Sequence, residues 1–161
     1  MSRILEVDCC VAGGGPAGVM AGLLFARAGC NTLVLEKHAD FLRDFRGDTV
    51  HPSTLEIMHE LGLLEDFLKR PHDRLAKLSG IFGGQQLDVT DFSSLNAQCT
   101  MHNAQCKFID FMPQWHFLDF LTEKAGTLPT FSIEMRAKVD DLVEDSDGRV
   151  TGVKATTPKV R

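Results

Sequence analysis

The feature that most constrains the fold is a glycine cluster between two apolar runs. Residues 5–12 read LEVDCCVA, a β-prone run that stops at Gly13-Gly14-Gly15-Pro16. Residues 17–29 read AGVMAGLLFARAG, with apolar side chains at helical spacing and a glycine as the stop signal. A second β-prone run, NTLVLE, covers residues 31–36. A strand, a turn, a helix and a strand within about 30 residues predict a βαβ unit. Its right-handed crossover makes the two strands parallel neighbours.

The middle of the chain predicts two helices and then several short strands. Apolar residues at helical spacing favour a helix from Pro52 that is broken at Gly62, followed by a short helix over residues 64–69. Between residues 79 and 113 helical spacing disappears, and short β-like runs alternate with polar turns. The segment around Arg46, FRGDTVHP, contains a turn signal.

The last third predicts one helix and three β runs. The helix begins at Pro113, presents Phe117, Leu118 and Leu121 on one side, and ends at Gly126. The β runs follow as a meander, and Asp147-Gly148 is a strong hairpin turn between the last two.

Composition narrows the class of protein. The chain has 161 residues, 43% of them apolar and 24% charged, which is typical of one globular domain. The net charge of −5 argues against nucleic acid or an anionic membrane surface as the main partner. No apolar stretch approaches the roughly 20 residues of a membrane span, and the N-terminus does not resemble a secretory signal. Five cysteines, an odd number, indicate a reduced, cytoplasmic compartment rather than a disulfide framework.

The glycine cluster has the spacing of a dinucleotide-binding turn. Gly13 permits the tight turn, Gly15 lets the backbone approach a pyrophosphate, and Gly18 allows the helix to pack closely. Glu36 ends the second strand 23 positions after Gly13, where a carboxylate can accept hydrogen bonds from the ribose 2′ and 3′ hydroxyls. That charge would repel a 2′-phosphate, which disfavours NADP in this site. The residues alone do not separate FAD from NAD, and the alternative is a glycine-rich turn that binds nothing.

Three runs together resemble a known family. The runs VAGGGPAGVMAGLLFARAG…VLEKH, FRGDTVHPSTLEIMHELGL and FMPQWHFLDFL are similar to the N-terminal part of the class A flavoprotein aromatic hydroxylases, which include para-hydroxybenzoate hydroxylase and the ubiquinone-pathway hydroxylases. The likeness extends from about residue 7 to residue 156. It implies an α/β, Rossmann-type FAD-binding domain with a parallel sheet, incomplete at the C-terminus. Residues 1–161 would be its N-terminal part, with residues 80–113 an excursion towards a substrate domain.

The resemblance also implies roles for individual residues. The pyrophosphate turn would contain Gly13, Gly15, Pro16, Ala17 and Gly18. The other implied cofactor contacts are Glu36 and Lys37 at the adenosine ribose, Arg46 and Gln114 towards the flavin, and Val139 near the adenine.

The implied activity is hydroxylation of a small aromatic substrate with consumption of NAD(P)H and O₂. The later family motifs, a Gly-Ala-Asp-Gly segment and a Gly-Asp motif, do not occur in these residues, so we expect the chain alone to be inactive. Two other functions remain open: a non-catalytic FAD- or ADP-binding remnant, and an NAD-linked dehydrogenase or flavin reductase with the same βαβ start. The sequence identifies no catalytic acid or base and leaves the oligomeric state open.

Other candidate sites have simpler interpretations. Cys99, His102 and Cys106 have ligand-like spacing but lack a fourth zinc ligand, so we interpret them as loop residues. Cys9 and Cys10, on the first strand, are expected to be buried as small apolar side chains. His51 either lies near the flavin or has a capping or surface role. The acidic residues from 140 to 147 are expected to form a solvated hairpin face.

Overall fold

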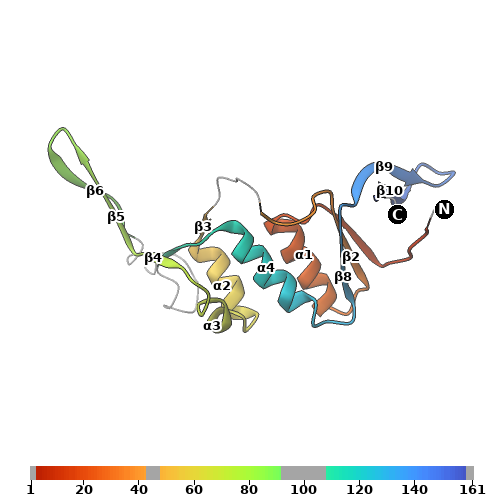
Figure 1. The fold of residues 1–161 in the computed structure, drawn as a ribbon, viewed down its shortest axis with the longest axis horizontal. Helices are drawn as coiled ribbons and strands as arrows, with labels where there is room; N and C mark the ends of the chain where they lie inside the picture. The colour runs from red at the N-terminus through yellow and green to blue at the C-terminus, as the bar shows by residue number, and fades with distance from the viewer. Residues whose placement is uncertain (1–2, 43–47, 92–107, 159–161) are drawn as a thin grey trace. The chain divides into compact units, whose positions relative to one another are not determined.

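A computed structural model describes residues 3–42, 48–91 and 108–158, which divide into two compact units. Unit 1 comprises residues 1–43 and 117–161, and unit 2 comprises residues 44–116. Figure 1 shows the helices and strands of both units. None of the helices among the described residues is long and apolar enough to cross a membrane.

Unit 1 contains the predicted βαβ unit. Strand β1 covers Cys9–Ala12, helix α1 covers Pro16–Arg27 and strand β2 covers Thr32–Glu36. Strands β1 and β2 pair in parallel, from Cys9 opposite Thr32 to Ala12 opposite Leu35. The helix ends where the sequence predicts, because Gly29 takes a φ of 90° that few other residues adopt.

The third strand of this sheet departs from the predicted meander. Strand β8, Phe131–Met135, pairs in parallel with the free edge of β2 and gives the order β1-β2-β8. Helix α4, Gln114–Ala125, immediately precedes it, and a helical crossover is the connection that parallel pairing requires. Of the three strands predicted to form the meander, the last two, β9 (Lys138–Glu144) and β10 (Val150–Thr156), form an antiparallel pair. The prediction of an α/β fold with a parallel sheet is confirmed, and β8 belongs to that sheet.

The sheet of unit 1 is covered on both faces. All five residues of β2 are buried, and they alternate between the two sides. The Val34 side chain faces Gly22 of α1, whereas Leu33 and Leu35 form a buried cluster with Ala137. The partly buried Val7, Val139 and Val153 pack against that cluster. Helix α1 and the β9–β10 hairpin therefore lie on opposite sides of the sheet (Figure 1).

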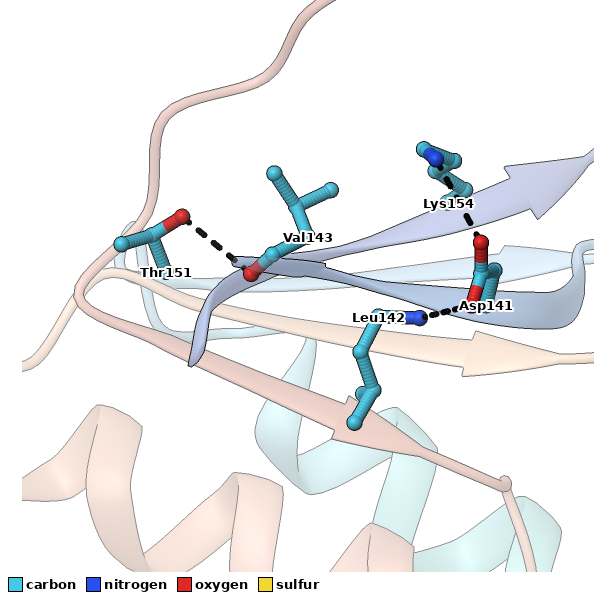
Figure 2. A network of polar contacts seen from close by, with 5 residues as sticks. All are labelled: Asp141, Leu142, Val143, Thr151 and Lys154. Carbon is cyan, nitrogen blue, oxygen red and sulfur yellow. Dashed lines mark hydrogen bonds and ion pairs between the residues drawn. The ribbon is translucent and has the colours of Figure 1, made fainter. Parts of the chain in front are cut away.

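The β9–β10 hairpin has the solvated acidic face that the sequence predicts. Residues 140–147 are all exposed. Figure 2 shows the Lys154 ammonium 3.3 Å from the Asp141 carboxylate on the opposite strand, and the Thr151 hydroxyl donating to the Val143 carbonyl. The predicted turn forms with Gly148 at a φ of 75°, and the Asp145 carboxylate accepts the backbone N–H groups of residues 147 and 149.

The described residues of unit 2 form helices α2 and α3 and two small antiparallel sheets. Helix α2 covers Pro52–Glu60 and helix α3 covers Leu64–Phe67, separated by Gly62 as predicted. Their buried side chains are Leu55, Glu56, Met58, Leu64 and Phe67. One sheet has the order β3-β7-β4, with strands Thr49–Val50, Ile109–Phe111 and Asp73–Leu75.

The second sheet of unit 2 is the β5–β6 hairpin, Lys77–Phe82 and Gln85–Asp91. Gly83 and Gly84 turn the chain with positive φ angles of 57° and 81°. The hairpin exposes large apolar side chains, among them Ile81 at 77% and Phe82 at 61%. The described residues therefore leave apolar surface of this hairpin uncovered. A two-stranded hairpin in isolation is only marginally stable in water.

Candidate cofactor-binding site

The glycine turn lies at the carboxyl ends of β1 and β2, the edge at which open α/β sheets bind ligands. Gly13 has a φ of 115°, a conformation that strongly favours glycine, and its N–H donates to the Leu35 carbonyl at 2.8 Å. The ladder between the strands thus continues into the turn. The predicted role of Gly13 in a tight turn is consistent with this geometry.

Gly18 permits a close approach between helix α1 and the turn. A Cβ atom built on Gly18 would lie 1.9 Å from the Gly13 carbonyl oxygen and 3.4 Å from a methyl group of Val11. A backbone oxygen cannot rotate away as a side-chain terminus can. The glycine is therefore required by the contact between helix and turn.

Gly15 faces open space instead. A Cβ atom on it would meet no atom within 4 Å, and its φ of −76° and ψ of −179° are extended backbone that any residue adopts. Nothing in the described residues requires glycine here. Gly15 is also the N-cap of α1, whose first turn has no side-chain cap and no acidic residue, so its first N–H groups remain available to an anion.

The Glu36 carboxylate lies against the same turn. One oxygen, Oε2, accepts the Gly14 N–H at 2.7 Å, and the other, Oε1, accepts the His38 N–H at 2.9 Å. Glu36 as a whole residue is only 3% exposed. A carboxylate is an acceptor only and can take several hydrogen bonds, two of which come here from backbone N–H groups.

Three more of the predicted contacts adjoin the turn and the end of β2. Pro16 is the first helical residue of α1, and Ala17 next to it is exposed. Lys37 is exposed directly after β2. The turn residues, Glu36 and Lys37 therefore come together at one edge of the sheet.

Two of the three other predicted contacts lie among the described residues. Gln114 is the first residue of α4 and is half-buried. Val139 lies on β9 and packs against the cluster of Leu33 and Leu35. Arg46 lies outside the described residues.

Two glycines that the sequence analysis did not single out also shape this site. A Cβ atom on Gly14 would lie 2.9 Å from the Glu36 Cβ atom. A Cβ atom on Gly22 would lie 2.7 Å from a methyl carbon of Val34 and 3.0 Å from the Phe131 ring. The four-residue spacing from Gly18 to Gly22, which puts both on one helix face, was the available signal for the second.

The other candidate sites have little support. The cysteines and histidine considered for zinc, residues 99, 102 and 106, lie outside the described residues, and within the described ranges no group of three or more ligating side chains could hold a metal. The expected burial of the paired cysteines is wrong for Cys10, which is exposed, because β1 is an edge strand here and its side chains alternate between covered and open faces. Partial desolvation, with a contribution from Cys9, raises the pKa of the Cys10 thiol. His51 is exposed at the N-cap of α2 and makes no side-chain capping bond.

The glycine turn has the features that an FAD pyrophosphate and adenosine ribose require. Gly15 borders open space at a helix N-terminus, and the N–H groups there suit a diphosphate. The buried Glu36 carboxylate beside them suits ribose hydroxyls. The described residues of this edge therefore fit the ADP half of the cofactor.

Comparison with known proteins agrees with this geometry. Residues 6–160 match the family model described as FAD binding domain. A curated relative, 6-methylpretetramide 4-monooxygenase of Streptomyces rimosus, is 30% identical over 151 residues, which are 92% of this chain and 34% of the relative. Rifampicin monooxygenase of Streptomyces venezuelae is 39% identical over 77 residues, which are 48% of this chain and 16% of that protein. The chain thus spans about a third of the length of the first of these relatives, and less of the second.

Solved structures share the fold. The anhydrotetracycline hydroxylase OxyS of Streptomyces rimosus superposes with a TM-score of 0.74 at 32% identity, covering 96% of this chain and 29% of that one. PqsL of P. aeruginosa in complex with 2-aminobenzoylacetate gives a TM-score of 0.76 at 21% identity, covering 92% and 38%. At that identity the second likeness concerns the fold alone. Because the family model covers nearly all of the sequence, the chain belongs to the FAD binding domain family.

Proposed function

We propose that this chain is the FAD-binding part of a flavin-dependent monooxygenase that hydroxylates a small aromatic substrate with NAD(P)H and O₂. The observation that carries the proposal is the glycine turn, where Gly15 borders open space beside the buried Glu36 carboxylate. Membership of the FAD binding domain family and the monooxygenase relatives support it. The three described cysteines, Cys9, Cys10 and Cys30, are free thiols, which supports a reduced cytoplasmic location as part of the same proposal.

Within this proposal, the chain's own residues bind and orient the cofactor. The N–H groups at the start of α1 hold the pyrophosphate, and Glu36 holds the adenosine ribose. Lys37, Arg46, Gln114 and Val139 remain proposed contacts, and residues 80–113 remain a proposed excursion towards a substrate domain. Bound FAD supplies the redox chemistry with O₂, while the protein supplies position and electrostatics.

The 161-residue chain by itself is expected to bind ADP, to bind FAD weakly, and not to hydroxylate any substrate. Strand β1 has a partner on one edge only among the described residues, and the β5–β6 hairpin exposes Ile81 and Phe82. Unpaired backbone groups and exposed apolar side chains favour association. The measurements are flavin content, size-exclusion chromatography and substrate-dependent NAD(P)H oxidation.

The control for this experiment is a protein extended to the length of the relatives. The extended protein should be yellow and consume NAD(P)H when an aromatic substrate is present. Hydroxylase turnover by the 161-residue chain would contradict the expectation for the chain. Absence of both ADP and FAD binding in the two proteins would contradict the proposed function itself.

Replacing Glu36 by alanine should weaken ADP and FAD binding by about 1.5–3 kcal/mol, the range for hydrogen bonds to a charged group. The physical reason is that the ribose hydroxyls lose their carboxylate acceptor. Isothermal titration calorimetry on both proteins measures the change. The exposed Glu123, replaced by alanine on α4, is a matched control that should bind as the unchanged chain does. Equal affinity for the Glu36 variant would remove that residue from the site.

A further inference from the structure

Gly14 is a glycine because of space, and not because of its backbone angles. It is buried in the centre of the turn, and its φ is not among the positive values that favour glycine. A Cβ atom on it would lie 2.9 Å from the Glu36 Cβ atom, 3.2 Å from Cγ and 3.2 Å from Oε2. Real Cβ atoms essentially never approach a carbon atom to 2.9 Å. Glu36 occupies the space that a side chain at position 14 would need.

The contact cannot be relieved by a change of rotamer alone. The Cβ atom of Glu36 is fixed to the backbone of β2, and β2 is buried along its whole length between β1 and β8. A methyl group on Gly14 must therefore push the turn and the end of β2 apart. That movement would lengthen the 2.7 Å bond from the Gly14 N–H to Oε2.

We propose that Gly14 is a positioning residue that sets the nucleotide specificity of this site. Through its N–H group and its missing side chain, it holds the Glu36 carboxylate where the carboxylate accepts an unmodified adenosine ribose and repels a 2′-phosphate. The inference rests on the proposed function, since it concerns the same ADP subsite. A carboxylate held at 3% exposure repels a nearby phosphate more strongly than one displaced into water, where the solvent screens both charges.

The test is a discrimination ratio, the affinity for ADP divided by the affinity for adenosine 2′,5′-bisphosphate, measured by titration calorimetry. The unchanged chain should prefer ADP. The Gly14→Ala variant should lower the ratio about tenfold, the scale set by loss of a hydrogen bond to a charged group. In a Glu36→Gln background, Gly14→Ala should leave the ratio unchanged, because the charge that it positions is gone. A loss of fold alone would lower both affinities together and would not move the ratio.

A second glycine provides the matched control. A Cβ atom on Gly152 of β10 would make only ordinary van der Waals contact, 3.9 Å from the Val143 Cβ atom. The Gly152→Ala variant should keep the ratio of the unchanged chain. A Gly14→Ala variant that also keeps it would overturn the inference. If the unchanged chain binds neither ligand, it is the proposed function that fails.

A measurement on the unchanged chain covers the case in which Gly14→Ala does not fold. Amide hydrogen exchange followed by NMR should show the Gly14 N–H protected in the free chain and still protected with ADP bound. Glu36→Gln should reduce that protection, because an amide oxygen is a weaker acceptor than a carboxylate oxygen. A Gly14 amide that exchanges freely in both states would overturn the proposed positioning.

Discussion

Replacing Gly18 by alanine is expected to destabilise the chain by about 3 kcal/mol, at the upper end of the range for overpacking a well-packed site. The new Cβ atom would lie 1.9 Å from the Gly13 carbonyl oxygen, so either α1 or the turn must move. For a chain of this size the thermal midpoint should fall by roughly 6–12 °C. Thermal unfolding followed by circular dichroism measures the loss.

Replacing Gly15 by valine is expected to have the opposite effect to Gly18→Ala, a loss of binding with little change in stability. Its Cβ atom would meet nothing within 4 Å, and the extended backbone suits a β-branched residue, so the thermal midpoint should change little. Nucleotide binding should be lost, because the side chain occupies the space of the pyrophosphate. Ala28→Val, at the exposed other end of α1, should change neither property. FAD binding retained by Gly15→Val would show that the turn has only a structural role.

Replacing Asp110 by asparagine is expected to raise the free energy of unfolding at pH 7 by about 1–3 kcal/mol, because a neutral amide costs less to bury without a partner than a carboxylate does. Asp110 is the central residue of β7 and its side chain is fully buried. Within residues 3–42, 48–91 and 108–158, neither of its carboxylate oxygens has a hydrogen-bond donor. The His72 imidazole does not supply a donor. Its Nδ1 lies 2.6 Å from the Arg70 carbonyl oxygen, and its Nε2 accepts a hydrogen bond from Arg74. The distance from Nε2 to the Asp110 carboxylate is 3.8 Å.

The same residue gives a pH dependence of known sign. Desolvation raises the pKa of Asp110 above its ordinary value of 3.8, although His72 and Arg74 oppose the shift. The folded state therefore binds the proton more tightly than the unfolded state does. The contribution of Asp110 to stability is present below pH 3.8 and is lost as the pH rises through the folded-state pKa.

Chemical denaturation from pH 4 to pH 8 measures both effects. The difference in unfolding free energy between the Asp110→Asn variant and the unchanged chain should grow with pH and then level off. Asp119→Asn, at an exposed position on α4, is the control and should change the unfolding free energy little. A flat difference for Asp110→Asn would mean that its carboxylate finds a partner in solution.

Local patterns predicted the parts of the fold that depend on local sequence. The βαβ unit, the break at Gly62, the amphipathic helix α4 and the hairpin at Gly148 follow from turn residues and periodicity within a few positions. The prediction of a meander is wrong for its first strand, β8, because that strand pairs with β2, and Thr32 and Phe131 are about 100 positions apart in the sequence. Residues 131–135 alone do not specify their partner strand.

The candidate site shows the same division. The glycine spacing and Glu36 were visible in the sequence, since both belong to a single βαβ unit. The requirement for Gly14 was not, because it depends on how closely the turn approaches the Cβ atom of Glu36 in the folded chain. The burial of Asp110 could not be recognised either. A lone acid in the run FIDF is indistinguishable from a solvent-facing residue until β3 and β4 lie beside it.

The order of strands in unit 1 has a consequence for synthesis on the ribosome. Strands β1 and β2 are complete when residue 36 has been made, whereas β8, the second neighbour of β2, begins at residue 131. At about 5–20 residues per second, the intervening chain takes roughly 5–20 s to appear. Throughout that interval the edge of β2 that later pairs with β8 has no partner strand. A nascent chain stalled before Phe131 should therefore recruit holdase chaperones that a chain stalled after Met135 releases.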